Sequence, residues 1–193
     1  SITHPELGAW INKRMTTEQD SLPNYVSIGK GSAGTAGFFP GQWAALPVKN
    51  TSAGIDFVKR NVAVDEGKFK KRLGILDSLN GDFERDFGTK DTRAYVDTYK
   101  GSLKFMNSKD IDAFDLEKEN ENIVSLYDRQ EFSRSCMLAG RLVERGVRFV
   151  KVKLGGWDYH DNLYGRLPSN ASKLDKGLSS LLTHLSQKGL LDS

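Results

Sequence analysis

Two side chains with metal-binding chemistry lie close together in the C-terminal third of the sequence. Asp158 and His160 are separated by one residue and follow directly after a pair of glycines and a tryptophan. In an extended segment, residues two apart point to the same side, so this carboxylate and this imidazole can converge on one metal ion. Asp161 and Asn162 come next, and we expect them to orient the ligands through hydrogen bonds. The competing interpretation is a capped turn with a hydrogen-bonded surface histidine.

The segment before this pair is predicted to be the strand that positions it. Residues 147–154 alternate strictly, so that Phe149 and Lys151 face one side while Val150 and Val152 face the other. We expect a buried parallel strand. Open α/β sheets bind their ligands in the loops beyond the carboxyl ends of the strands, which is where the Asp-x-His pair falls.

Helical patterns flank this strand on both sides. Apolar residues recur at helical spacing over 128–145, up to Gly146, and again over 168–188, up to Gly189. Both helices are expected to pack beside the strand. His184 sits beside the apolar stripe of the second helix, and we expect it to be solvated.

The first part of the chain is predicted to form a helix, a strand and a loop. Residues 6–15 have helical spacing, residues 23–28 form a short β-prone run, and residues 29–41 are rich in glycine. The start of the loop matches G-x-G-x-x-G, a pattern of dinucleotide-binding sites. Gly37 and Pro40 follow too soon for the helix that such a site needs, so we discount nucleotide binding.

The middle of the chain is predicted to be mainly helical. Residues 65–87 form an amphipathic pattern that we expect to be interrupted near Asn80–Gly81, and residues 91–106 form a second helical pattern. The acidic stretch 110–122 is expected to be a loop with a turn of helix. We interpret the whole of 65–122 as a helical insertion that lies over the sheet edge or the mouth of the site.

Together these patterns indicate an α/β fold that is rich in helix and has few strands. Only two strands are convincing, and two strands do not make a stable open sheet. We therefore expect a single partial domain, a piece of a longer protein with strands missing at both ends. It divides into a strand and Gly-rich loop portion at 1–64, the helical insertion at 65–122, and a helix–strand–helix portion with the metal loop at 123–193.

Composition argues against two classes of partner. The 28 basic residues are interspersed with 25 acidic ones, so no basic block is available to track the phosphates of a nucleic acid. No apolar run approaches the roughly 20 residues that cross a bilayer. The single cysteine, Cys136, lies in an apolar helical pattern with no histidine nearby in sequence, which predicts a buried and inert thiol.

Four segments carry a resemblance to one bacterial family. They are His4–Trp10, Arg141–Val150, Gly155–Asn162 and Leu185–Asp192. Together they resemble the family of unknown function DUF1501, whose members are placed in the alkaline phosphatase and sulfatase-like superfamily. The resemblance spans most of the chain and is strongest after Arg134. It implies an alkaline phosphatase-like α/β fold, of which this chain is an internal fragment.

The chemistry that this resemblance implies is hydrolysis of phosphate or sulfate esters. A serine, threonine or modified cysteine nucleophile would act beside one or two divalent metal ions, and zinc, manganese or iron would suit Asp158 and His160. The segment around His4 is similar to a stretch that follows the nucleophile in alkaline phosphatases, which implies a nucleophile before Ser1 and a supporting role for His4 at the site. Substrates would be small-molecule or polysaccharide esters. Full-length relatives often carry twin-arginine export signals, which implies an extracytoplasmic, periplasmic location.

A second hypothesis is a binding or interaction protein that has kept the fold without catalysis. The Gly-rich loop and the aromatic residues Phe38, Phe39 and Trp43 would then contact a partner such as a polysaccharide. The analogy with the family favours the hydrolase. Metal binding by Asp158 and His160 is the property that distinguishes the two hypotheses.

Overall fold

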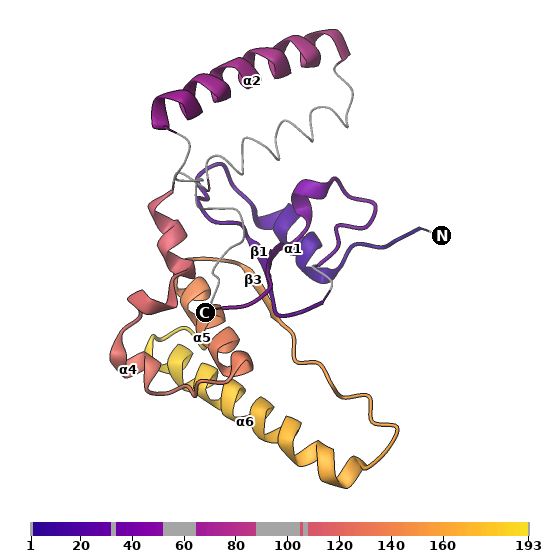
Figure 1. Ribbon diagram of the computed structural model, residues 1–193, viewed down its shortest axis with the longest axis vertical. Helices are drawn as coiled ribbons and strands as arrows, with labels where there is room; N and C mark the ends of the chain where they lie inside the picture. Colours follow the sequence, from indigo (N-terminus) through magenta and orange to yellow (C-terminus); the bar gives the residue numbers. More distant parts are fainter. Residues whose placement is uncertain (1, 32–33, 52–64, 88–104, 106–107, 193) are drawn as a thin grey trace.

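The structure is a small parallel sheet with helices on both of its faces. The computed structural model describes residues 2–31, 34–51, 65–87, 105 and 108–192. Its helices are α1 (Leu7–Met15), α2 (Glu66–Phe87), α4 (Glu121–Val124), α5 (Glu131–Glu144) and α6 (Leu163–Gln187), and its strands are β1 (Tyr25–Ile28), β2 (Leu46–Val48) and β3 (Phe149–Val152). Short 3-10 segments lie at Gly41–Trp43, Lys109–Phe114 and Leu116–Lys118. In Figure 1, α2 stands apart from the sheet. No helix of the described residues is long and apolar enough to span a membrane.

The three strands pair in the order β2–β1–β3, and both pairings are parallel. Central β1 aligns Val26 with Leu46 on one side and with Val150 on the other. All of β1 is buried, whereas β3 is only partly buried. The α/β class and the parallel strand are therefore confirmed. The strand is shorter than 147–154 and less buried than predicted, because within the described structure it has a neighbouring strand on one side only.

Strand β2 is missing from the sequence-based prediction. It has three residues, and its central Pro47 lies opposite Ser27 of β1. Proline cannot donate a ladder hydrogen bond and is confined in sheets to edge positions or bulges, so a short run around a proline gives a weak strand signal. In the structure β2 is an edge strand, and the Gly29 N–H donates to the Val48 carbonyl at 2.9 Å, which extends the pairing by one bond.

The alternation along β3 separates two layers, as predicted. Val150 and Val152 pack against the core cluster that the apolar side of α5 forms with the sheet. Phe149 faces α1 instead, and a Cβ added to Gly8 would lie 2.7 Å from its ring. Lys151 shares that face and pairs with a carboxylate just before α1. Helix α5 therefore covers one face of the sheet and α1 covers the other.

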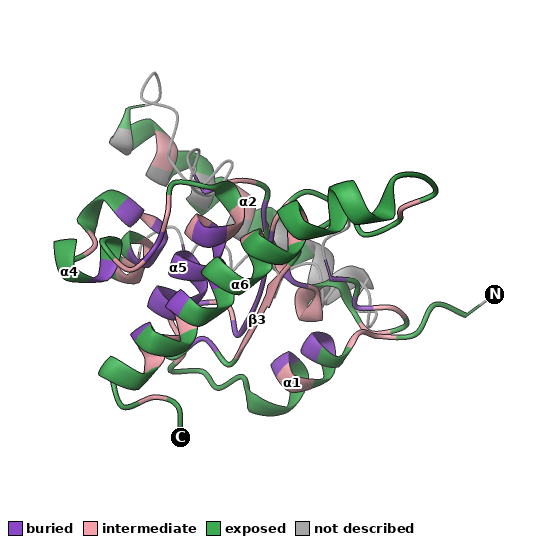
Figure 2. Ribbon diagram, turned by 90° about the horizontal axis from the view of Figure 1, so that it is seen from below, coloured by how far each residue is buried: buried purple, intermediate pink, exposed green. Residues whose placement is uncertain are grey.

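Helix α6 packs on α5 and not directly on the sheet. Two glycines allow the close approach, since a Cβ at Gly177 would lie 2.7 Å from the Phe132 ring and one at Gly140 would lie 2.6 Å from the His184 imidazole. The buried residues of α6 are Gly177, Ser180 and His184, all in its second half. Figure 2 shows α5 mostly buried and the outer side of α6 exposed. The prediction that both helices pack beside β3 is thus correct for α5, whereas α6 forms a further layer.

The start of α6 also differs from the prediction. Asn162, with φ of 45°, precedes the helix, so that Pro168 lies inside it instead of at its start. The early turns of α6 are exposed, and water can satisfy the carbonyl that the proline leaves without a donor. The end is as predicted, because Gly189 adopts φ of 67° and the Leu190 N–H donates to the Leu185 carbonyl at 2.9 Å.

Helix α2 continues without a break to Phe87, so the predicted interruption near Asn80–Gly81 is wrong. A glycine inside a helix costs only about 1 kcal/mol relative to alanine, which is too little to stop a helix by itself. The second predicted helix, 91–106, lies outside the described residues apart from Phe105, which is buried. The stretch 110–122 contains short 3-10 segments and the start of α4, as expected, and the described part of 65–122 contains no strand.

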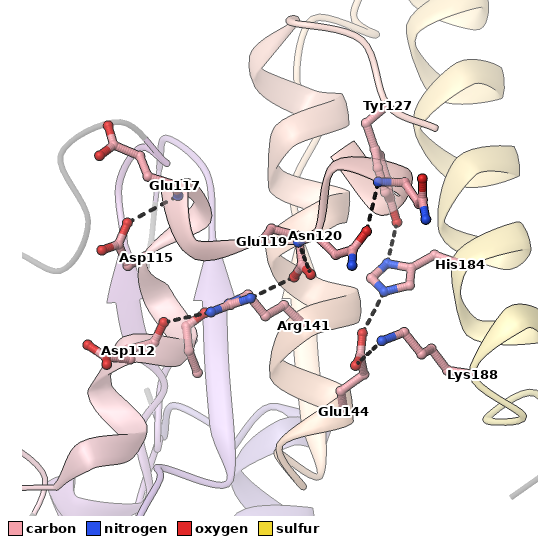
Figure 3. Close-up of polar contacts among 12 residues, drawn as sticks. Asp112, Asp115, Glu117, Glu119, Asn120, Tyr127, Arg141, Glu144, His184 and Lys188 are labelled. Carbon is pink, nitrogen blue, oxygen red and sulfur yellow. Dashed lines mark hydrogen bonds and ion pairs between the residues drawn. The ribbon is translucent and has the colours of Figure 1, made fainter. Parts of the chain in front are cut away.

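His184 joins three segments of the chain, as Figure 3 shows. Its side chain is fully buried, its Nε2 lies 2.6 Å from a carboxylate oxygen of Glu144, and its Nδ1 lies 3.0 Å from the Tyr127 hydroxyl. A carboxylate can only accept, so Nε2 carries a proton, and a neutral ring then accepts the O–H of Tyr127 at Nδ1. Lys188 pairs with the other Glu144 oxygen at 2.8 Å. The expectation of a solvated His184 is therefore wrong, because its partners come from elements that its own helix does not reveal.

Arg141 joins α5 to the acidic segment before it. Its guanidinium donates to the Glu119 carboxylate at 2.8 Å and to the backbone carbonyls of Ala113 and Asp112 at 2.9 and 3.1 Å. Both side chains of the ion pair are less than a tenth exposed. Burial by itself raises the pKa of the Glu119 carboxyl, but the hydrogen bonds from Arg141 and from the Asn120 N–H, together with the charge of Arg141, outweigh burial and hold the pKa below its usual value.

Cys136 is buried in α5, as predicted. Burial raises the pKa of its thiol to about 11, so the thiolate is scarce at neutral pH. This cysteine is a structural side chain of the core and not a nucleophile.

Replacing Gly140 by alanine is expected to lower the free energy of unfolding by about 1–3 kcal/mol, because the added methyl overlaps the His184 imidazole. Gly74→Ala in α2 is the matched control. No atom lies within 4 Å of its added Cβ, and alanine is favoured in a helix by up to about 1 kcal/mol. Urea unfolding followed by circular dichroism measures both variants. Equal stability of the two would show that the α5–α6 contact is looser than described.

The Glu119–Arg141 pair is expected to make stability depend on acid pH. Because the folded-state pKa of Glu119 lies below its unfolded value, the carboxylate stabilises the fold above the unfolded pKa, and this contribution is lost as the pH falls through the folded value. Glu119→Gln should be less stable than wild type at pH 7 by about 1.5–3 kcal/mol. The difference should shrink as the pH falls below about 4, near the unfolded pKa. Urea unfolding at a series of pH values tests this, and a constant difference would contradict it.

Candidate metal centre

The predicted metal-binding residues lie in a long loop after β3. Figure 1 shows this loop, residues 153–162, extending away from the end of the sheet before the chain turns into α6. Because all three strands are parallel, the loop leaves the sheet at its carboxyl edge. The loop that carries the predicted site therefore begins at the edge where α/β sheets bind their ligands.

Asp158 and His160 point toward each other. A carboxylate oxygen of Asp158 lies 3.1 Å from Nε2 of His160, and both side chains are more than four fifths exposed. Two ligands of a tetrahedral zinc ion at bond lengths of about 2.0–2.1 Å are roughly 3.3 Å apart. The observed separation is close to this value, so one cation could bind both atoms with a small adjustment. The same geometry is also that of a simple surface hydrogen bond.

The two residues supply fewer ligands than a stable site needs. A structural or catalytic zinc ion takes three or four protein ligands. Within the described residues, no group of three or more His, Cys, Asp or Glu side chains is close enough to hold a metal ion. Further ligands would have to come from elsewhere in the protein.

The three residues predicted to support the site have other contacts. Asp161 pairs with Arg166 at 2.7 Å, and the Asn162 side chain lies beside the first turn of α6, next to Gly165. His4 lies before α1, with its ring edge-to-face against Phe38 at 5.9 Å between centroids. The structure thus brings Asp158 and His160 together and places the supporting residues around other partners.

The loop is held by contacts that involve little side-chain burial. Gly156 adopts φ of 82°, and its carbonyl accepts the side-chain amide of Asn170 in α6 at 2.7 Å. Trp157 is exposed and donates its indole N–H to the Leu154 carbonyl at 3.0 Å. The Tyr159 hydroxyl is enclosed and has no hydrogen-bond partner in the described structure.

Sequence reasoning missed a second polar cluster around β3. Glu6, just before α1, accepts the Lys151 ammonium at 2.6 Å and the Tyr25 hydroxyl at 2.8 Å. The Lys151 hydrogen bond lowers the pKa of Glu6, while burial and the adjacent Glu6 raise the pKa of Tyr25. The only sequence signal was the placement of Lys151 on one face of the strand. Glu6 lies 145 positions before Lys151, and Tyr25 lies 126 positions before it, so spacing in the sequence could not have shown the cluster.

The turn after β1 brings a second lysine over the backbone. Gly29 and Gly31 have φ of 115° and 121°, a region that side chains rarely adopt. A Cβ added to Gly31 would lie 2.5 Å from the ammonium of Lys153. No helix follows this turn in the described residues 34–40, in agreement with the rejection of a dinucleotide-binding site. The glycines are used for close approach to a lysine.

A third cluster lies where β2 joins the start of α5. The buried Thr51 donates its N–H to Glu131 at 2.9 Å, and its hydroxyl lies 3.3 Å from the other oxygen of that carboxylate. Arg134 donates to the same hydroxyl at 3.2 Å. Thr51 is 5% exposed, so this hydroxyl fastens the chain after β2 to α5 and is closed to a substrate.

The aromatic residues singled out in the sequence form part of a ring cluster next to α1. Phe38 packs edge-to-face on Phe39 at 5.1 Å between centroids, and Phe39 packs on Trp10 at 4.6 Å. The Lys13 ammonium lies 4.1 Å from the Phe39 centroid. Trp10 and Phe38 are each about half exposed, at 48% and 55%. Trp43 lies in the 3-10 segment that follows and is partly buried.

Comparison with known proteins identifies the family and nothing finer. A family model described as "Protein of unknown function (DUF1501)" matches residues 1–193. No curated protein matches the chain, and no solved structure matches it. The match covers every residue and confirms the resemblance to this family, which includes the segments His4–Trp10 and Gly155–Asn162. The chain belongs to the DUF1501 family.

Proposed function

We propose that the full-length protein is a metal-dependent hydrolase of phosphate or sulfate esters, with the nucleophile outside this chain. Asp158 and His160 would hold one divalent cation, and zinc, manganese or iron suits a carboxylate and an imidazole. The proposal includes an alkaline phosphatase-like fold for the full-length protein and an extracytoplasmic, periplasmic location. Its substrates would be small-molecule or polysaccharide esters.

The observation that carries this proposal is the 3.1 Å approach of the Asp158 carboxylate to the His160 imidazole. Both side chains are exposed in the loop that leaves the carboxyl edge of a parallel sheet, the edge at which α/β proteins bind their ligands. The separation is close to that of two ligands of one tetrahedral ion.

In this proposal the residues of the chain bind and orient the substrate. A divalent cation, once bound, would polarise an ester oxygen as a Lewis acid. Asp158 supplies negative charge and His160 a neutral nitrogen, while the amide of Asn170 fixes the loop backbone at Gly156. Asp161 pairs with Arg166 at 2.7 Å on the exposed surface of the loop.

A second candidate function, binding of a polysaccharide without catalysis, is favoured by the ring cluster. His4, Trp10, Phe38 and Phe39 are linked by successive edge-to-face contacts, and two of them are half exposed. Aromatic rings with one apolar face in solvent can stack on the C–H face of a sugar ring. The Lys13 ammonium over the Phe39 ring adds a charged group to the ring cluster.

The hydrolase proposal predicts that Asp158→Ala and His160→Ala each reduce bound metal and ester hydrolysis in the full-length protein. We expect at least about a tenfold loss, since even changes outside the ligand shell cost 10–100-fold in metal affinity. Elemental analysis gives the metal content, and p-nitrophenyl phosphate and sulfate report hydrolysis. Asp175→Ala, which removes an exposed carboxylate from α6, is the control and should change neither. Unchanged metal content and activity in both loop variants would end the assignment.

The binding hypothesis predicts that Trp10→Ala and Phe38→Ala weaken co-sedimentation with an insoluble polysaccharide. The loss should be roughly 3- to 10-fold for each ring, corresponding to about 0.5–1.5 kcal/mol of aromatic contact. Tyr164→Ala is the matched control, because this ring is exposed on α6 away from the cluster. Equal sedimentation of all three variants and wild type would exclude the ring cluster as the binding surface.

A further inference from the structure

A cavity of about 250 Å³ lies at the amino edge of the sheet, opposite the metal loop. One wall comes from the segment Gln19–Asn24, which leads into β1, and the other comes from the turn between α5 and β3, with Arg145, Gly146 and Arg148. Both segments enter the first residues of neighbouring parallel strands. The cavity therefore shares no residue with the candidate metal centre at the carboxyl edge.

Two guanidinium groups line this cavity with unused hydrogen-bonding capacity. Arg145 is the C-cap residue of α5, and its nearest carboxylate, that of Asp110, is 3.8 Å away, which is too far for a hydrogen bond. Arg148 is exposed and has no ion pair within 4 Å among the residues that the structure describes. By contrast, Arg141 donates to three acceptors. Each guanidinium has five N–H donors, so even with Asp110 near Arg145 and Asp20 near Arg148 most of these donors have no protein acceptor among the described residues.

The one carboxylate in the cavity wall is already occupied. Asp20 accepts the Thr17 N–H at 2.7 Å and the Asn24 side-chain amide at 2.6 Å. Burial raises the pKa of Asp20, but these hydrogen bonds and the nearby Arg148 outweigh it, so the pKa lies below its usual value and the group is ionised at neutral pH. Ser21, also in the wall, donates its hydroxyl to Asp110. The carboxylates of Asp20 and Asp110 therefore offset the charge of the two guanidinium groups, and what the cavity offers an anion is the unused N–H donors of Arg145 and Arg148.

We propose that this cavity binds a small oxyanion through Arg145 and Arg148. The planar guanidinium fork matches the paired oxygens of a carboxylate, phosphate or sulfate group. The volume is below the roughly 300–1,000 Å³ of sites for drug-sized ligands, so the body that carries the anion is no larger than a small organic acid or a sugar phosphate. This site is independent of the proposed hydrolase, because the metal loop contributes nothing to it.

Binding of three test anions to the full-length protein decides the proposal. Sodium phosphate, sodium sulfate and sodium citrate are titrated by calorimetry. Sodium chloride keeps the ionic strength constant within each titration, and the titrations are repeated at higher chloride concentrations. We expect at least one anion to bind and binding to weaken as the chloride concentration rises, since salt screens exposed charges. Arg145→Gln and Arg148→Gln should each weaken binding by about tenfold or more, as expected for a lost charged hydrogen bond.

Two controls separate loss of the site from loss of the fold. Arg129→Gln removes an exposed arginine just before α5, outside the cavity wall, and should bind like wild type. Arg148→Lys keeps the charge and should bind between wild type and Arg148→Gln, provided that circular dichroism shows the same fold for all variants. Binding of phosphate and sulfate alone would identify a tetrahedral oxyanion, and binding of citrate alone would identify a carboxylate. Wild-type affinity in the Arg145→Gln/Arg148→Gln double variant, or no binding of any of the three anions at millimolar concentration, would overturn the proposal.

Discussion

The contact between Gly140 of α5 and the buried imidazole of His184 in α6 is the constraint on which the C-terminal half depends. Only a glycine allows the ring to approach α5 this closely, because any Cβ there would lie 2.6 Å from Nδ1. The imidazole then spans from the Glu144 carboxylate to the Tyr127 hydroxyl and satisfies the polar atoms of all three residues in the core. Since α5 also covers the sheet, this one contact sets the position of α6 relative to the strands.

The parallel sheet gives the molecule two edges with different chemistry. At the amino edge, the segments that enter β1 and β3 bring together Arg145, Arg148 and the occupied carboxylate of Asp20. At the carboxyl edge, a glycine turn, a lysine and the Asp158–His160 pair face solvent. Parallel strands always collect their entering segments at one edge and their leaving segments at the other. Groups that are far apart in sequence therefore meet in two places separated by the length of a strand.

Features of local origin were predictable from the sequence, and features of long-range origin were not. The alternation of β3, the glycine ends of α5 and α6, the buried Cys136 and the approach of Asp158 to His160 all depend on residues within one turn or one strand. The environment of His184 depends on residues 40 and 57 positions away. No periodicity within α6 carries that information.

Two further differences between prediction and structure, the missed strand β2 and the earlier start of α6, both involve a proline. The strand that the sequence did not predict, β2, contains Pro47, and the helix expected to begin at residue 168 begins at Leu163, so that α6 includes Pro168. Each proline lacks only one donor. An edge position in the sheet and solvent around the early turns of α6 make that loss tolerable, and both properties belong to the tertiary structure.

Helix α6 is packed on α5 along its second half only, and its first half is exposed. Its buried residues, Gly177, Ser180 and His184, form the contact with α5. The exposed first half carries Asn170 and its hydrogen bond to Gly156. From Leu163 to Gly177 the helix is roughly 21 Å long at 1.5 Å per residue. If α6 tilted by about five degrees around its contact with α5, its first residue would move by roughly 2 Å. The position of the loop that holds Asp158 and His160 is therefore set by packing about two to four turns of helix away from Asn170, and small changes in the core around His184 would be larger at the loop.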